Sequence, residues 1–334
     1  MDKWKCKNEW FENNAWTTRA LTTSNGIGTI TYGGERKNVT IRYRAVDKVG
    51  NISEEATTVI NLDKTAPVIS PITNSSNQNW TNKDIQLSWS ITEDGSGIAK
   101  VEHSSDGKTW AGELQSYEWY GLTRNNQRND TIYIRATDKA GNVSNVQSTN
   151  MKIDKTKPTI TLSPDGQTTS NKTLSSKITA KDTGGSNLKT LQYAWSTSNT
   201  QEPSSYQTFT NEQPVSKSNA SVGKHYLWVK VSDNAGNQTS KVSKAFNVTG
   251  LTRGTTKYVK KGGTITLTPT KQGDAGEITW TTSDSNGASL STTKGNSVTV
   301  TGKTAGTYTV TAKESAGGAT TSYKIEVTQL TSGG

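Results

Sequence analysis

The sequence predicts an all-β protein made of several antiparallel β-sandwiches in tandem. Three observations support this prediction: apolar residues alternate with Thr, Ser or charged residues over short stretches, turns rich in Gly, Asp and Asn separate those stretches, and the pattern repeats with a spacing near 90 residues, the size of one small sandwich. Only 29% of the 334 residues are hydrophobic, against about 45–50% in an ordinary globular chain. This composition suits strands with one solvated face and argues against one large α/β enzyme.

The repeat is clearest where an alternating stretch ends in the motif Asp-x-x-Gly-Asn. The motif starts at Asp47, returns 91 residues later at Asp138, and returns again 95 residues later at Asp233. The Asp carboxylate can accept a backbone N–H across the turn, while Gly or Asn supplies a positive φ. A second motif, Asp-Lys-Thr-x-Pro, starts at Asp63 and again at Asp154. We expect its Pro to stiffen a short link into the next unit.

These motifs divide the chain into four units, residues 1–63, 64–154, 155–249 and 250–334. The front half also repeats, with strands predicted at 85–91 and 98–104 in the second unit and at 178–180 and 188–195 in the third. The fourth unit lacks both motifs but alternates at 264–268, 278–281, 298–300, 307–312 and 323–327. This pattern indicates a further sandwich of about seven strands. Because each unit should contact only its neighbours, we expect an elongated array.

The first unit is shorter than the others. Trp16 lies 31 residues before Asp47, whereas Trp110 lies 28 residues before Asp138, so Met1 falls near the middle of a sandwich. We therefore expect residues 1–63 to form a partial sandwich whose first strands are missing. A half-sandwich exposes its apolar face and an unpaired edge, which indicates either a fragment of a longer chain or a sheet that a partner strand completes.

The charge of the chain favours anionic partners. The net charge is +10, and the excess lies in residues 155–249, with a net charge of +6, and in residues 250–334, with +4. Anionic wall polymers and acidic glycans fit such a balance. No run of Lys and Arg resembles a nucleic-acid-binding arm, so no specific nucleic acid is expected. No run of about 20 apolar residues is present, so no membrane span is expected either.

Residues for catalysis are scarce. The chain has one cysteine, Cys6, and two histidines, His103 and His225, which lie in different units. A Ser-His-Asp arrangement therefore cannot be assembled within one unit, and no Gly-rich phosphate loop or paired-Cys zinc site is present. His103 falls where Tyr193 lies in the next unit, which indicates a packing role. We predict that the protein is not an enzyme and requires no cofactor.

Acidic residues should meet at one end of each complete sandwich. In a sandwich whose first and last strands run the same way, the loop after the second strand, the turn that ends the long repeated strand and the incoming linker share a pole. In the second unit this pole combines Glu93 and Asp94 with Asp138 and the linker residue Asp63. Crowded carboxylates are unfavourable unless a cation joins them, and Ca²⁺ takes six to eight oxygens from loops of this kind.

We therefore predict two possible structural Ca²⁺ sites at the unit junctions. The predicted ligands are Asp63, Asp94 and Asp138 in the first site, and Asp154, Asp182 and Asp233 in the second. The alternative is that Asp47, Asp138 and Asp233 merely cap their turns. The fourth unit lacks the linker Asp, although Asp274 and Glu314 occupy comparable loops, so we expect no clamp there and the most flexible joint between units three and four.

Aromatic residues offer a second possible binding surface. Trp110, Trp119 and Tyr120 lie close together in the second unit and could stack against a sugar. Such residues more often pack in a core or staple a loop, and this alternative is the favoured one.

The two motifs also carry a resemblance. Units one to three resemble the bacterial immunoglobulin-like repeats of large surface proteins, in which a strand ends in Asp-x-Ala-Gly-Asn and Asp-x-Thr-x-Pro follows at the junction. The stretch 121–123 is similar to fibronectin type III modules. Residues 258–328 resemble the group 2 bacterial Ig-like domains, through 262–267, 278–280 and 303–312. The resemblance implies tandem Ig-like (fibronectin III-like) sandwiches, and some giant adhesins with such repeats bind calcium at the junctions.

These families occur in adhesins, in wall-bound enzymes and in phage virions, and the function follows by resemblance. The first expectation is a non-enzymatic extracellular stalk or adhesion segment of a bacterial cell-surface protein, acting as a semi-rigid spacer. The alternatives are a phage tail or virion decoration protein and the accessory modules of a secreted glycan-degrading enzyme. The expected partner is a bacterial or host surface glycan, a protein receptor or an anionic wall polymer, and the expected location is the cell surface or a virion.

Overall fold

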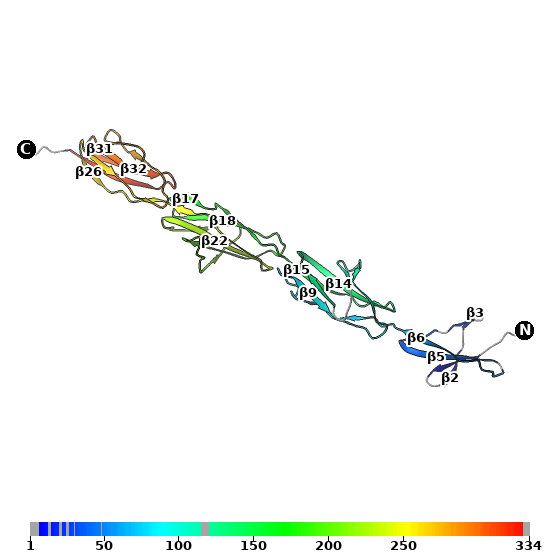
Figure 1. Ribbon diagram of the computed structural model, residues 1–334. Helices are drawn as coiled ribbons and strands as arrows, with labels where there is room; N and C mark the ends of the chain where they lie inside the picture. The colour runs from blue at the N-terminus through cyan, green and yellow to red at the C-terminus, as the bar shows by residue number, and fades with distance from the viewer. Residues whose placement is uncertain are drawn as a thin grey trace, which may run out of the picture. The chain divides into compact units, whose positions relative to one another are not determined.

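The computed structural model describes residues 7–12, 15–19, 22–24, 27–29, 31–47, 49–114 and 120–329, and these residues form strands, turns and loops (Figure 1). They contain no helix long and apolar enough to cross a membrane. The chain groups into two compact units, Met1–Ile153 and Asp154–Gly334. Each unit contains antiparallel sheets of the kind the alternating sequence predicts, and the predicted fold class, tandem Ig-like β-sandwiches, is confirmed.

Residues 7–62, at the start of the first compact unit, form one four-stranded sheet in the order β2-β1-β5-β6 and a separate hairpin, β3-β4. The bounds are β1 Lys7–Glu12, β2 Ala15–Arg19, β3 Thr22–Ser24, β4 Ile27–Thr29, β5 Arg36–Val46 and β6 Ala56–Leu62. The sheet has the same order as the larger sheet of the second sandwich. That further strands complete it stays a prediction.

The second sandwich packs the sheet β12-β11-β14-β15 against the sheet β13-β9-β8, with β7 and β10 paired beside them. The bounds are β7 Val68–Ile69, β8 Thr73–Asn74, β9 Ile85–Trp89, β10 Ile91–Thr92, β11 Ile98–Ser104, β12 Ala111–Glu113, β13 Tyr120–Arg124, β14 Arg128–Asp138 and β15 Gln147–Ile153. Alternate residues of β9 and β14 meet in one core, in which Ile85 and Ile134 are fully buried.

The third sandwich, in the second compact unit, consists of the sheet β16-β18-β21 and the sheet β17-β24-β22-β19-β20, with β23 paired to β22. The bounds are β16 Thr159–Ser163, β17 Gln167–Thr169, β18 Leu174–Lys181, β19 Leu188–Ser196, β20 Gln207–Thr208, β21 Pro214–Lys217, β22 Gly223–Asp233, β23 Gln238–Val242 and β24 Phe246–Val248. Its core centres on Phe246, which the Trp195 ring meets edge-on at 5.0 Å between centroids.

The fourth sandwich packs the sheet β26-β33-β32-β29 against β27-β31-β30, and the pair β25-β28 lies where the chain passes from the third sandwich into the fourth. The bounds are β25 Gly250–Leu251, β26 Lys257–Lys260, β27 Thr264–Leu267, β28 Lys271–Gln272, β29 Ile278–Thr282, β30 Ala288–Leu290, β31 Val298–Gly302, β32 Gly306–Glu314 and β33 Thr320–Thr328. Trp280 fills the centre of its core and is only 1% exposed.

The two histidines lie in packed surroundings in separate compact units. His103 is half-buried in β11, opposite Ile134. His225 is buried in β22, and its Nε2 is 2.8 Å from the carbonyl oxygen of Ser221. Cys6 lies outside the described residues.

Candidate metal centres

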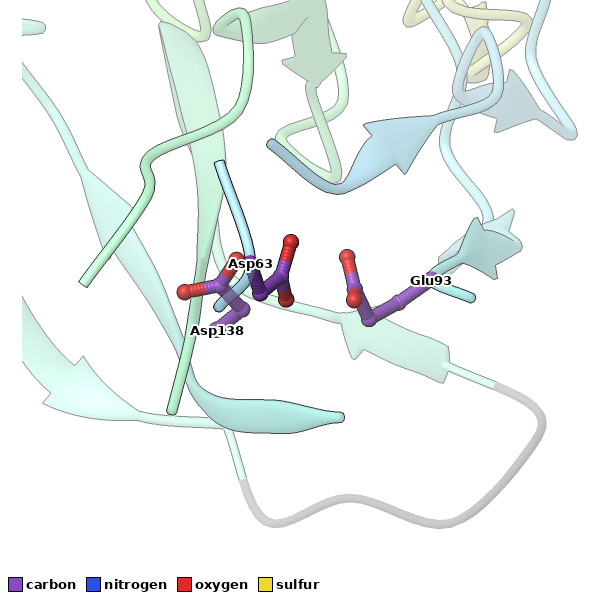
Figure 2. A group of neighbouring side chains, drawn as sticks. All are labelled: Asp63, Glu93 and Asp138. Carbon is purple, nitrogen blue, oxygen red and sulfur yellow. The ribbon is translucent and has the colours of Figure 1, made fainter. Parts of the chain in front are cut away.

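In the second sandwich, three carboxylates meet at the pole where the chain enters. Asp63 lies in the linker after β6, Glu93 directly follows β10, and Asp138 ends β14. One carboxylate oxygen of each lies within 4.8 Å of the others, and Figure 2 shows Asp63 between Asp138 and Glu93. Asp138 is only 1% exposed, whereas the other two are half-buried. Three elements distant in sequence therefore bring like charges together.

Hydrogen bonds from the backbone orient each of these carboxylates. Asp63 Oδ2 accepts from the amide of Ser96 at 2.6 Å, and Asp138 Oδ1 accepts from the amide of Asn142 at 2.8 Å. The Asn142 side chain also donates to Asp138 Oδ2 at 2.7 Å and to the Asp63 carbonyl at 3.1 Å. Hydrogen bonds from the hydroxyl and then the amide of Ser96 lower the pKa of Asp63, so this carboxylate is held in its charged form.

The structure brings Glu93, and not Asp94, into this group. Asp94 is exposed, and its backbone carbonyl accepts a hydrogen bond from Lys37 Nζ at 3.1 Å. The predicted ligand Asp94 is thus replaced by its neighbour, because Glu93 is the residue that directly follows β10. The same position in the third sandwich is Asp182, which directly follows β18. Aligning the ends of these strands would have identified Glu93 from the sequence.

In the third sandwich, the structure brings together all three residues that the sequence pointed to. Oxygens of Asp154, Asp182 and Asp233 lie within 4.8 Å of one another. Asp154 and Asp233 are completely buried, and Asp182 is half-buried. This group is therefore the more deeply enclosed of the two.

The hydrogen bonds of the second sandwich recur here. Asp233 accepts from the amide of Asn237 at 2.8 Å and from its side chain at 2.7 Å, and that side chain also donates to the Asp154 carbonyl at 2.9 Å. Asp182 accepts from the amides of Gly184 at 2.9 Å and Asn187 at 2.7 Å. The linker is thereby fastened to the sandwich that follows it.

A glycine makes room for the linker carboxylate in both groups. A Cβ atom on Gly95 would collide with the carboxylate of Asp63, and one on Gly184 would collide with that of Asp154. Only glycine permits such a close approach between a backbone and a charged side chain. The two sites are therefore built in the same way: the linker Asp packs against a glycine in the loop that follows the second strand of the sandwich.

The first sheet provides a contrast. Asp47 accepts hydrogen bonds from the amides of Val49 and Asn51, both at 2.9 Å, and from the Asn51 side chain at 2.7 Å. Among the described residues, no second and third acidic group joins it. The side-chain and amide hydrogen bonds of Asn51 lower the pKa of Asp47. The motif can thus cap a turn without gathering carboxylates.

The fourth sandwich has a single carboxylate at the same pole. Glu314 ends β32, as Asp138 ends β14, and is completely buried. The Glu314 carboxylate accepts hydrogen bonds from five groups: the amides of Gly276, Ala316, Gly317 and Ala319, and the hydroxyl of Thr249. Burial alone would raise the pKa of Glu314, but these hydrogen bonds outweigh it and lower the pKa to about 2.

The expectation that nothing clamps the joint between the third and fourth sandwiches is wrong. Thr249 lies in this joint and donates its hydroxyl to Glu314 Oε1 at 2.7 Å and its amide to the Thr169 carbonyl at 2.9 Å. The Ser170 amide donates to the Gly317 carbonyl at 2.9 Å. Asp274, the other acidic residue considered for this pole, instead pairs with Lys224 at 3.1 Å.

Of the three aromatic residues considered as a sugar-binding face, Trp110 is the one whose side-chain contacts are described. The guanidinium of Arg135 lies over the Trp110 ring at 4.2 Å, and its Nε bonds Glu102 at 2.9 Å. Whether the three residues share a face stays a prediction. Trp119 lies outside the described residues, and Tyr120 begins β13.

No protein-family model matches the sequence, and no curated protein matches it. Among solved structures, the three N-terminal domains of the Hoc outer capsid protein of bacteriophage RB49 align over 80% of this chain and 100% of that one, with 13% identity and a TM-score of 0.36. Titin domains A168–A170 give the same coverage and identity with a TM-score of 0.34. Fibronectin(III)-like modules of Clostridium thermocellum CbhA align over 53% and 93%, with 18% identity and a TM-score of 0.27. Likenesses this weak say nothing about what the chain binds.

Proposed function

We propose that the chain is a non-enzymatic extracellular spacer segment of a bacterial cell-surface protein or, alternatively, of a phage virion. In this proposal, Ca²⁺ bound at the second and third sandwiches fixes their incoming linkers. The observation that carries the proposal is the repeated three-carboxylate pole, which joins a linker Asp, the acid after the second strand and the Asp that ends the long strand. Two copies of one arrangement, at the same place in two sandwiches, favour a common role.

The donor chemistry suits a hard divalent cation. Three carboxylates in a half-closed pole repel one another, and oxygen ligands on loops are what Ca²⁺ prefers. The backbone amides that orient these carboxylates use only part of their acceptor capacity, because each oxygen carries two lone pairs. Since one carboxylate belongs to the linker, a cation would tie the linker to the sandwich more firmly than the Asn142 and Asn237 side chains do alone.

The test compares Asp233→Asn with Asp47→Asn in the full chain. The two residues make the same turn hydrogen bonds, but only Asp233 belongs to a carboxylate group. We expect Ca²⁺ to raise the unfolding temperature of the wild type, with a stabilisation of about 2.7 kcal/mol at 100 times Kd. Asp233→Asn should remove the contribution of the third sandwich, and Asp47→Asn should leave the calcium response unchanged.

Calcium also predicts the outcome of a second substitution. Asp182→Asn relieves repulsion but leaves one of the amides of Gly184 and Asn187 without its acceptor, so it should cost clearly more stability with calcium present than with a chelator. Equal unfolding temperatures with calcium and with a chelator in the wild type would leave turn capping as the only role of these residues. The spacer role requires a radius of gyration in solution well above the roughly 20 Å of one compact 334-residue globule.

A further inference from the structure

A cavity opens at one side of the third sandwich, where the edges of its two sheets face each other. Strand β20 is the edge of one sheet and β21 is the edge of the other. The cavity has a volume of about 360 Å³ and is lined mainly by Tyr193, Trp195, Ser205, Gln207, Ser216 and Lys217. A volume near the lower end of the 300–1,000 Å³ range of small-molecule sites suits one ring-sized ligand.

Two aromatic rings form rigid walls of this cavity. Trp195 packs edge-on against Phe246 at 5.0 Å, and Tyr193 packs edge-on against Phe209 at 6.4 Å between centroids. The Tyr193 hydroxyl also donates to Gln207 Oε1 at 2.9 Å, and Gln207 lies opposite Tyr193 in β20. Because core packing and this hydrogen bond hold the rings in place, little ordering is needed when a ligand binds.

One cationic side chain lines this cavity. Lys217 is half-buried on the same side of β21 as the buried Val215. None of the ion pairs of the described residues includes it. A ligand carrying an anionic group would give this cation a partner. The indole nitrogen of Trp195 is buried out of reach of the cavity, so Trp195 contributes the wall of its ring and not a hydrogen bond.

We propose that this cavity binds one sugar unit that carries an anionic group, either a carboxylate or a phosphate. The apolar face of the ring packs against Tyr193 and Trp195, and the anionic group pairs with Lys217. The ring hydroxyls meet the Ser205 hydroxyl and the Gln207 amide. The net charge of +6 of residues 155–249 favours the approach of such a ligand. This site does not involve the carboxylate groups, so it stands independently of the proposed calcium sites.

The test follows the Trp195 indole N–H resonance of the full chain by NMR, with a chelator present so that no calcium site contributes. Trp195→Phe identifies the resonance. The probes are glucuronate, glucose 6-phosphate and glucose. We expect the two anionic sugars to shift the resonance with a Kd of about 1 mM, and glucose to bind at least about tenfold more weakly. A response to only one anionic probe would identify carboxylate or phosphate as the group recognised.

A matched pair of lysine variants tests the anion contact. Lys217→Gln should reduce the affinity for both anionic sugars to that for glucose, while Lys189→Gln, at an exposed position of β19 that does not line the cavity, should leave it unchanged. The proposal is overturned if no probe shifts the indole resonance, or if Lys217→Gln has no effect. It is also overturned if inorganic phosphate or acetate binds as tightly as the sugars, or if only a peptide strand pairing with the β21 edge produces the shift.

Discussion

The entering poles of the third and fourth sandwiches place different residues at equivalent positions. In the third, the linker residue is Asp154, which faces the strand-end residue Asp233, and Asp182 adds a third negative charge. In the fourth, the linker residue is Thr249, which donates its hydroxyl to the strand-end residue Glu314 at 2.7 Å. The pole of the third sandwich gathers three carboxylates, whereas the pole of the fourth surrounds one carboxylate with five hydrogen-bond donors.

The linker residue therefore decides how each pole is stabilised. An Asp in the linker, as in the third sandwich, places its carboxylate beside the carboxylate that ends the long strand. A Thr in the linker, as in the fourth, donates its hydroxyl to that carboxylate instead. The fourth pole also packs backbone against backbone, since a Cβ on Gly317 would lie 2.7 Å from the Thr169 carbonyl carbon. We infer that the joint between the third and fourth sandwiches is held by direct hydrogen bonds, whereas calcium is proposed to hold the linkers of the second and third.

The largest effect should come from Glu314→Ala. It leaves four amides and the buried Thr249 hydroxyl without their acceptor, and we expect a loss of about 4 kcal/mol in the stability of the fourth sandwich. Amide exchange of Gly276, Ala319 and Thr249, measured by NMR, should accelerate accordingly. The control is Glu326→Ala, a half-buried carboxylate on β33 that accepts from Thr307 and pairs with Lys324, with an expected change of about 1 kcal/mol or less. Equal effects of the two variants would contradict the assigned role of Glu314.

Acid should weaken the fourth pole next most strongly. The pKa of Glu314 is about 2 in the folded protein and 4.5 in its ordinary state, so its ionised form adds stability that is complete above about pH 4.5. This contribution, about 3 kcal/mol, should disappear as the pH falls from 4.5 towards 2. Calorimetry at pH 5, 3 and 2 measures the loss. In Glu314→Gln this part of the pH dependence should vanish, and an unchanged acid profile in that variant would contradict the prediction.

A smaller effect is expected from Gly317→Ala. The new methyl group would collide with the Thr249 hydroxyl and press on the backbone at Thr169 and Ser170, which we expect to cost about 2 kcal/mol and to loosen the joint. Protection of the Ser170 amide, which donates to Gly317, reports on the joint directly. Gly33→Ala serves as the control because nothing lies within 4 Å of its added atom. Undiminished protection of Ser170 in Gly317→Ala would show that the close packing is not needed.

Much of this arrangement follows from the sequence. Alternation and the Asp-x-x-Gly-Asn motif predicted the long strands, and the repeat spacing placed Asp154, Asp182 and Asp233 at one pole. The sequence pointed to Asp94 where the structure has Glu93, because residue type guided the choice and the end of the strand did not. Glu314 was placed in the correct loop, but its role depends on four amides and a threonine hydroxyl that only the folded backbone brings together.

The parallel pairing of a strand near the start of a sandwich with its last strand has a mechanical consequence. In the third sandwich β17 runs parallel to β24, with three residue pairs, and in the fourth β26 runs parallel to β33, with four. Tension applied through the two ends of such a domain shears all of these hydrogen bonds at once instead of peeling them apart one by one. The second sandwich has a single parallel bridge between Thr81 and Ile153. Stretching single molecules should therefore unfold the second sandwich at lower force than the third or fourth, so resistance to tension would be graded along the chain.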